Sequence, residues 1–295
     1  MSDDKQSCES CSSTTCSAKG KTESETDKDF RERQELARRM CQIKHKIFVL
    51  SGKGGVGKSS VAANLAISLA RLGRTVGVLD IDLHGPSIPR LFGLEGAEIT
   101  AVGDTIRPVM TDQDVRVMSV GFMLRTQDDA IIWRGPLKHG IIKQFLKDVE
   151  WGELDYLIID SPPGTGDEPL SVAQLIDDAD GVVVVTTPQA VAITDVRKSI
   201  SFTRQLNIPV LGVVENMSGF ICPECGTRTD LFGSGGGREM ATDMGVPFLG
   251  EIPIDPGIVR AGDSGELPAY LSGSSPGAQA FADIVKALIA TVERE

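Results

Sequence analysis

The chain has 295 residues, a formal net charge of −11 and 41% hydrophobic residues. This acidic balance argues against non-specific binding to nucleic acid or to an anionic membrane, because both require basic surfaces. No apolar run reaches about 18 residues, the length required of a transmembrane helix, and the polar N-terminus lacks the apolar core of a secretory signal. We therefore expect a cytoplasmic protein, in which six cysteines indicate thiols or metal ligands rather than disulfides.

Residues 1–30 differ from the rest of the chain because they are rich in Ser and Thr and poor in apolar side chains. Such a segment buries too little apolar area to offset its chain entropy, so we predict a disordered tail. The tail carries Cys8, Cys11 and Cys16. Residues 31–46 combine mixed charge with helical spacing and predict a helical linker. We expect residues 47–295 to form one further domain.

From residue 47 onward, short apolar runs alternate with helical patterns. Because the strands show almost no polar alternation, we expect an α/β fold with a doubly wound, mainly parallel sheet and helices on both faces. Residues 87–135 are less regular and predict a lobe of short strands and loops. Strands are predicted at 47–52, 75–82, 155–160, 181–187, 209–217 and 247–254, and helices at 61–73, 137–149, 191–206 and 276–295.

The motif GKGGVGKS at 52–59 lies directly between the first predicted strand and a helix. It matches the P-loop pattern, in which backbone N–H groups and a helix N-terminus surround phosphate oxygens. Lys58 is expected to place its ammonium on the β- and γ-phosphates, and Ser59 to ligate Mg²⁺. The predicted nucleotide-binding residues of this loop are Gly52, Lys53, Gly54, Gly55, Val56, Gly57, Lys58, Ser59 and Ser60.

Acidic residues end two further predicted strands. Asp80 and Asp82 lie in LDIDLHGPS, and Asp160 ends the strand of DYLIIDSPPGTGD. Ligands gather at the carboxyl ends of strands in such sheets, so we expect these side chains beside the P-loop. There Asp160 would hold the water shell of Mg²⁺, and Gly164 and Gly166 would present N–H groups to a γ-phosphate.

A second motif, CPEC, places Cys222 and Cys225 in a segment rich in Gly and Pro. One such pair supplies two soft ligands, whereas a tetrahedral metal or a cubane cluster requires about four. Three interpretations remain: a redox pair, a metal site completed by a second copy of the chain on a two-fold axis, and two surface thiols. The loop context argues against the redox pair, which belongs at a helix N-terminus.

KGGVGKS, with a lysine directly after the first P-loop glycine, resembles the deviant P-loop of MinD, ParA and the nitrogenase iron protein. The resemblance implies that Lys53 reaches across a dimer to the nucleotide of the partner. It also implies that Asp82 positions the attacking water. Asn216, in VVENMS, occupies the place where this family hydrogen-bonds adenine.

Together, GKGGVGKSS, DIDLHGPS, DSPPGTGDE, ENMSGFICPECG and IPIDP resemble the Mrp/ApbC-type P-loop ATPases over about residues 40–290. The resemblance implies a homodimeric, slow, Mg²⁺-dependent ATPase that uses ATP. It also implies a labile 4Fe-4S cluster bound by Cys222 and Cys225 of both subunits and passed to apo iron–sulfur proteins. Iron–sulfur assembly proteins are further implied partners.

The N-terminal cysteines depart from the four-cysteine motif of the scaffold branch of this family. Their spacing is C-x2-C-x4-C, and the fourth cysteine follows only after a long gap. Two interpretations remain, a second cluster site and a redox-labile tail without a cluster. The residues concerned are Cys8, Cys11, Cys16 and Cys41.

The alternative hypothesis is a MinD- or ParA-like positioning switch with structural zinc or free thiols at CPEC. Such proteins hold a membrane through a basic amphipathic helix, or bind DNA through surface cations. The C-terminal sequence KALIATVERE is not basic, and the acidic excess lies in residues 47–295. A nitrogenase-type reductase is disfavoured, because its cysteines come singly from two separated loops.

Overall fold

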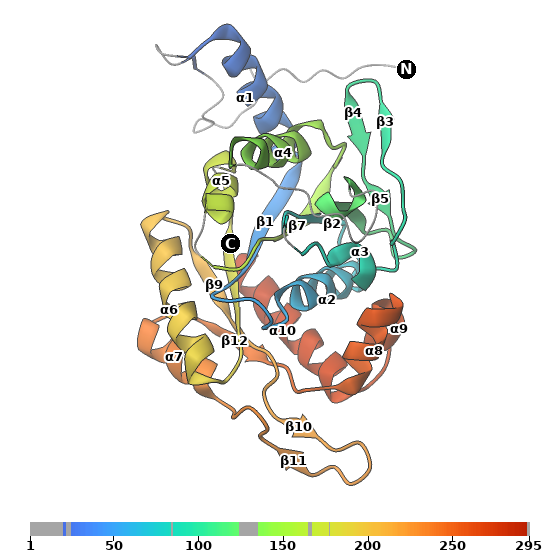
Figure 1. The fold of residues 1–295 in the computed structure, drawn as a ribbon, viewed down its shortest axis with the longest axis vertical. Coiled ribbons are helices and arrows are strands. Elements are labelled where there is room, and N and C mark those ends of the chain that lie inside the picture. The colour runs from blue at the N-terminus through green and yellow to red at the C-terminus, as the bar shows by residue number, and fades with distance from the viewer. Residues whose placement is uncertain are drawn as a thin grey trace.

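Figure 1 shows the computed structural model, which describes residues 20–21, 25–83, 85–123, 135–164, 167–176 and 178–293. Cys8, Cys11, Cys16 and Gly166, to which the sequence assigns candidate roles, lie outside the described residues. The predicted disordered tail lies outside them for the most part as well. Within the described part of the chain, no helix has both the length and the apolar character needed to cross a membrane.

The described residues form a central sheet with the strand order β12-β9-β8-β1-β7-β2-β6-β5. All neighbouring strands are parallel except β5 and β6, which are antiparallel. The predicted doubly wound, mainly parallel sheet is therefore confirmed. The strands are β1 (Ile43–Ser51), β2 (Val76–Asp80), β5 (Val109–Met110), β6 (Arg116–Ser119), β7 (Leu154–Asp160), β8 (Gly181–Thr186), β9 (Val210–Glu215) and β12 (Phe248–Glu251).

Helices cover both faces of this sheet, and each face has its own apolar core (Figure 1). One core contains side chains of α2 (Lys58–Arg71), α3 (Ile88–Leu91), α8 (Pro256–Ser264), α9 (Leu267–Leu271) and α10 (Pro276–Val292). The other contains side chains of α1 (Asp27–Met40), α4 (Gly135–Asp148), α5 (Asp167–Leu175), α6 (Ala190–Gln205) and α7 (Gly236–Met244). Parallel strands buried on both faces explain the continuous apolar runs of the sequence.

The boundary between the linker and the sheet differs from the prediction. The helix predicted up to residue 46 ends at Met40, and β1 begins at Ile43. Ile43 pairs with Leu154 of β7, so the residues before the apolar run are already part of the strand. Leu36 and Met40 of α1 are buried against the domain, so this helix is part of the core.

Two small hairpins and a short helical turn lie outside the helices and the main sheet. In the irregular region predicted at 87–135, β3 (Thr100–Val102) pairs with β4 (Thr105–Arg107), and a 3-10 helix, η3 (Val120–Met123), follows β6. The second hairpin, β10 (Phe220–Ile221) with β11 (Arg228–Thr229), projects away from the sheet at the bottom of Figure 1. It carries the CPEC motif between its strands.

Asp155 of β7 connects β1 and the start of β2 at the amino-terminal end of these strands, which is the end opposite the P-loop. Its carboxylate accepts hydrogen bonds from Lys44 Nζ at 2.6 Å and from the backbone and hydroxyl of Thr75 at 2.9 Å. The hydrogen bond from Lys44 and that from the Thr75 backbone lower the pKa of Asp155 to about 2. The ionised form of Asp155 therefore stabilises the fold.

We expect Asp155→Asn to lower the free energy of unfolding by about 1 to 2 kcal/mol at neutral pH. The folded pKa is below the unfolded value, so this contribution is present above about pH 4 and is lost as the pH falls toward about 2. Urea denaturation of both proteins across this range measures the difference. Asp283→Asn, at an exposed position on α10, is the control, and a difference independent of pH would contradict the assignment.

Candidate functional site

The P-loop connects β1 to α2 and depends on glycines at two close approaches. A Cβ on Gly52 would lie 2.4 Å from the carbonyl carbon of Asp195 in α6. A Cβ on Gly57, which has φ +81°, would lie 2.3 Å from Asn216 Nδ2. By contrast, none of the described atoms lies within 4 Å of a Cβ added to Gly54 or Gly55. The loop is therefore fixed at its ends and open at its tip, where a phosphate can approach.

Lys58 begins α2 and points into a cluster of carboxylates. Its Nζ lies 2.5 Å from Asp160 Oδ1, 3.2 Å from Ser59 Oγ and 3.7 Å from Asp82 Oδ2. Only 6% of the Lys58 side chain is exposed, and Asp160 is fully buried. The structure thus brings the predicted phosphate-binding lysine and both predicted aspartates to one point beside the P-loop.

Asp80 and Asp160 are neighbours in the ladder between β2 and β7, and both are fully buried. Burial and the adjacent Asp160 raise the pKa of Asp80 to about 8. Burial also raises the pKa of Asp160, although Lys58 acts in the opposite direction. Burial is the main cause of both shifts, because it disfavours the ionised carboxylate, and a cation bound beside these groups would favour the ionised form.

The residues predicted to hold Mg²⁺ fit that ion. Asp160 Oδ2 is buried and accepts no hydrogen bond from any described residue. The Ser59 hydroxyl lies 3.2 Å from Lys58 Nζ, which pairs with the other oxygen of Asp160. Mg²⁺ commonly binds one or two carboxylates together with substrate phosphates and water, and these oxygens supply that donor set.

The segment after Asp160 contacts the strand that precedes the P-loop. Gly164 N–H donates to Ser51 O at 2.8 Å, and Ser161 N–H donates to Val49 O at 3.3 Å. Gly164 has φ +92°, a conformation that favours glycine. This predicted switch segment is therefore attached to the end of β1, next to the phosphate loop.

Lys53 and Asn216 also lie at the P-loop. The carbonyl of Lys53 accepts a hydrogen bond from Ser51 Oγ at 3.0 Å, and its side chain is half-buried. Asn216 donates from Nδ2 to Val56 O at 2.9 Å and from its backbone to Thr186 O at 2.8 Å. Their predicted contacts, with a partner's nucleotide and with adenine, stay predictions.

The CPEC motif forms a tight turn at the end of the β10–β11 hairpin. Cys222 N–H donates to Thr227 O at 3.0 Å, and Gly226 N–H donates to Cys222 O at 2.9 Å. Cys225 is exposed, and its Sγ lies 3.3 Å from Thr227 Oγ1. The hydrogen bond with the Thr227 side chain lowers the pKa of the Cys225 thiol, which favours the metal-binding thiolate.

The hairpin supplies two thiols and no further ligand from its own chain within the described residues. There, no group of three or more His, Cys, Asp or Glu side chains could hold a metal ion. Cys41, the candidate fourth ligand of a second cluster, is exposed at the C-terminal end of α1. Its predicted companions in the tail lie outside the described residues, so that hypothesis stays untested.

Sequence reasoning missed Glu215, a fully buried carboxylate at the end of β9. It accepts hydrogen bonds from Ser218 Oγ at 2.6 Å, from Gly235 N–H at 2.8 Å and from Gly237 N–H. The glycine-rich turn before α7 thus resembles an anion site, but a carboxylate of the same chain fills it. A Glu before Asn216 and the run GSGGG were the available signals.

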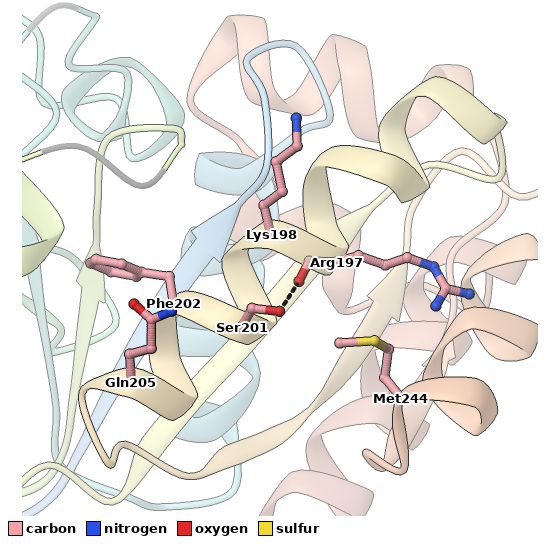
Figure 2. Close-up of a pocket in the computed structure, with 6 residues that line it drawn as sticks. All are labelled: Arg197, Lys198, Ser201, Phe202, Gln205 and Met244. Carbon is pink, nitrogen blue, oxygen red and sulfur yellow. Dashed lines mark hydrogen bonds between the residues drawn. The ribbon is translucent and has the colours of Figure 1, made fainter.

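A groove of about 440 Å³ lies along α6, and no P-loop residue is among those that line it. Figure 2 shows Lys198 and Arg197 pointing to different sides of it, with the Met244 thioether near Ser201. Arg197 pairs with Asp243 at 2.6 Å, and Lys198 pairs with Asp195 at 3.1 Å. Because these charges are already paired, we assign the groove no chemical role.

A family model matches residues 42–289, and it is the ParA model described as NUBPL iron-transfer P-loop NTPase. The chain belongs to this family. It is also 47% identical over 287 residues to the iron-sulfur cluster carrier protein of Methanocaldococcus jannaschii, which covers 97% of this chain and 96% of that relative. The cytosolic Fe-S cluster assembly factor CFD1 of Chaetomium globosum is 51% identical over 254 residues, which are 81% of this chain and 84% of that relative.

Solved structures confirm the fold of this family member. A nucleotide-binding protein from Archaeoglobus fulgidus, solved in complex with ADP and with cobalt found in it, is 44% identical with a TM-score of 0.73. The match covers 81% of this chain and 93% of that chain. The cell division ATPase MinD of Pyrococcus furiosus is 26% identical with a TM-score of 0.61, over 83% of this chain and 98% of that chain.

We expect Lys58→Ala to weaken Mg²⁺-nucleotide binding by about 100-fold, because the variant loses a charge-assisted contact to phosphate. Fluorescence titration with a labelled ADP measures the affinity. Lys198→Ala, which removes an exposed lysine of α6, is the matched control and should bind like the wild type. A Lys58→Ala protein that binds within about threefold of the wild type would contradict the assignment of this P-loop.

Proposed function

We propose that this chain is a slow, Mg²⁺-dependent ATPase that carries a labile 4Fe-4S cluster and transfers it to apo iron–sulfur proteins. The observation that carries the proposal is the joint presence of a P-loop and an exposed CPEC hairpin at the same end of the sheet. The names of two relatives, a cluster carrier and a cytosolic assembly factor, support both this function and a cytoplasmic location.

A homodimer completes the cluster site in this proposal. Each chain offers Cys222 and Cys225, and a cubane cluster takes about four thiolates, so two hairpins meet on a two-fold axis. Leu231 and Phe232, just after the hairpin, have exposed fractions of 58% and 45%. Large apolar side chains exposed beside the thiols suit a surface that a second copy covers.

The same proposal gives each residue of the nucleotide site a role in ATP hydrolysis. Lys58 moves from the carboxylates to the β- and γ-phosphates of ATP, and Lys53 of the partner subunit approaches the same nucleotide. Asp82 orients the attacking water. Mg²⁺, held through Ser59 and Asp160, neutralises phosphate charge when it is bound.

Hydrolysis is coupled to the cluster through the turn after β9. Asn216 contacts Val56 of the P-loop, whereas Glu215 accepts the hydroxyl of Ser218, two residues before the hairpin. Ser218 Oγ also lies 3.1 Å from Glu251 Oε2, and Arg228 of the hairpin lies 3.5 Å from the Glu251 carboxylate. A displacement of the P-loop can therefore be passed through neighbouring polar contacts to Arg228, on the hairpin that carries the thiols.

Anaerobic purification with iron and sulfide analysis tests the carrier function. We expect about four iron atoms per dimer and broad absorbance near 400 nm in the wild type, both lost in Cys222→Ala/Cys225→Ala. Nucleotide affinity should be unchanged, because neither cysteine belongs to the P-loop at residues 52–60. Cys41→Ala is the control at the core site. Full core iron in a Cys225→Ala protein would overturn the assignment.

The same experiment addresses the N-terminal cysteines. Iron that persists in the double variant and disappears when Cys8, Cys11 and Cys16 are also replaced would establish a second site in the tail. If no form of the protein takes up iron after reconstitution, the MinD- or ParA-like switch becomes the better hypothesis. That alternative has the support of the shared fold and leaves CPEC to zinc or free thiols.

We expect Ser218→Ala to uncouple the thiols from the nucleotide. In the cluster-free wild type, Mg²⁺-ATP should change the alkylation rate of Cys225 several-fold, and the variant should lose most of this response while it keeps its nucleotide affinity. Ser201→Ala, which removes an exposed hydroxyl on α6, is the control. An unchanged response in Ser218→Ala would exclude this set of contacts as the coupling route.

A further inference from the structure

Asp80 is a buried carboxyl group to which the proposed chemistry gives no role. It ends β2, is fully buried and has both oxygens occupied. Oδ1 accepts the backbone N–H of Asp82 at 3.0 Å, and Oδ2 accepts the hydroxyl of Ser119 at 2.8 Å. A carboxyl group held on both oxygens has a fixed orientation, so Asp80 is well suited to hold another part of the chain in place.

Ser119 ends the neighbouring strand β6 and is also fully buried. It pairs in register with Asp80 across the ladder. Its hydroxyl accepts the N–H of Gly121 at 2.9 Å and donates its own proton to Asp80. Because the hydroxyl is used as both acceptor and donor, its direction is set by the backbone of β6 and η3.

The two hydrogen bonds of Asp80 connect Ser119 to the main chain of Asp82. Ser119 orients Asp80, and Asp80 holds the N–H of Asp82 at the point where the chain leaves β2. In the structure, the Asp82 carboxylate lies 3.7 Å from Lys58 Nζ. In the proposed mechanism Lys58 turns to the phosphates, and the hold on the Asp82 backbone is then what keeps its carboxylate directed at the P-loop.

We propose that Ser119 and Asp80 are positioning residues for ATP hydrolysis, which fix the main chain of Asp82 so that its carboxylate meets the attacking water. The proposal rests on the proposed role of Asp82. It assigns Asp80 a structural action, since each of its oxygens holds another part of its own chain through a hydrogen bond. Asp160, with a buried oxygen that accepts no hydrogen bond from any described residue, has the donor capacity that a metal needs.

The first test is Ser119→Ala in the full chain. We expect kcat for ATP hydrolysis to fall about 10- to 100-fold, because a small misplacement of a catalytic group has an effect of this order. The KM for ATP and the affinity for labelled ADP should stay within about twofold, since the P-loop is not involved. Ser119→Thr keeps the hydroxyl and should restore most of kcat. A Ser119→Ala protein with the kcat of the wild type would overturn the proposal.

Asp80→Asn separates positioning from metal binding and keeps the test valid if Ser119→Ala fails to fold. The Asn side chain can still accept the Asp82 N–H through its oxygen and donate to Ser119 Oγ through its nitrogen. We therefore expect an unchanged Mg²⁺ concentration for half-maximal rate, with any loss of activity confined to kcat. A large rise in the Mg²⁺ requirement would show Asp80 to be a metal ligand and overturn the positioning role.

Asp82→Asn distinguishes failure of the inference from failure of the proposed function. If Asp82→Asn hydrolyses ATP at the rate of the wild type, the role of Asp82 is wrong. If it is inactive while Ser119→Ala is unaffected, only the positioning proposal is wrong. Because Ser119 acts through Asp82, Ser119→Ala/Asp82→Asn should be no slower than Asp82→Asn alone. An additive loss in the double variant would overturn the proposal.

Discussion

The structure of the site depends on one buried ammonium, that of Lys58, set among the carboxylates of Asp80, Asp82 and Asp160. Charges this far from water interact strongly and are costly unless they are paired or hydrogen-bonded. Asp160 accepts a hydrogen bond from the Lys58 ammonium, whereas Asp80 accepts one from the Ser119 hydroxyl and one from a backbone N–H. Burial raises the pKa values of Asp80 and Asp160, so a cation bound beside them would stabilise their ionised forms.

Strand order explains why these groups meet. β1 lies between β8 and β7, and β7 lies next to β2. The carboxyl ends of these parallel strands therefore lie together, and they carry the P-loop after β1, Asp160 of β7 and Asp80 of β2. On the other side of β1, β8 and β9 end at Thr186 and Glu215, which places Asn216 over the P-loop. Parallel pairing converts positions far apart in sequence into one site.

The sequence predicts the parts of this arrangement whose physical cause is local. Buried apolar runs predict the parallel strands, and the glycines and lysines at 52–59 predict the phosphate loop, because both signals lie within a few residues. α7 was missed because its start is glycine-rich, and its first N–H groups are satisfied by Glu215, some twenty positions earlier. Ser119 was missed for a similar reason, since its importance comes from pairing with β2 rather than from its own segment.

The two halves of the proposed function need opposite environments, and the fold separates them over a short distance. Phosphate chemistry needs buried, oriented charge, which strand ends and the P-loop supply. A cluster that must be handed to another protein needs accessible thiolates, and Cys225 is exposed on a hairpin that projects from the domain (Figure 1). Glu215 and Ser218 belong to both regions, because they anchor the turn that begins at Asn216 and leads to the hairpin. In the proposed function, the described part of each chain brings only its CPEC pair to the core site, so assembly of a dimer would control whether a cluster is held there.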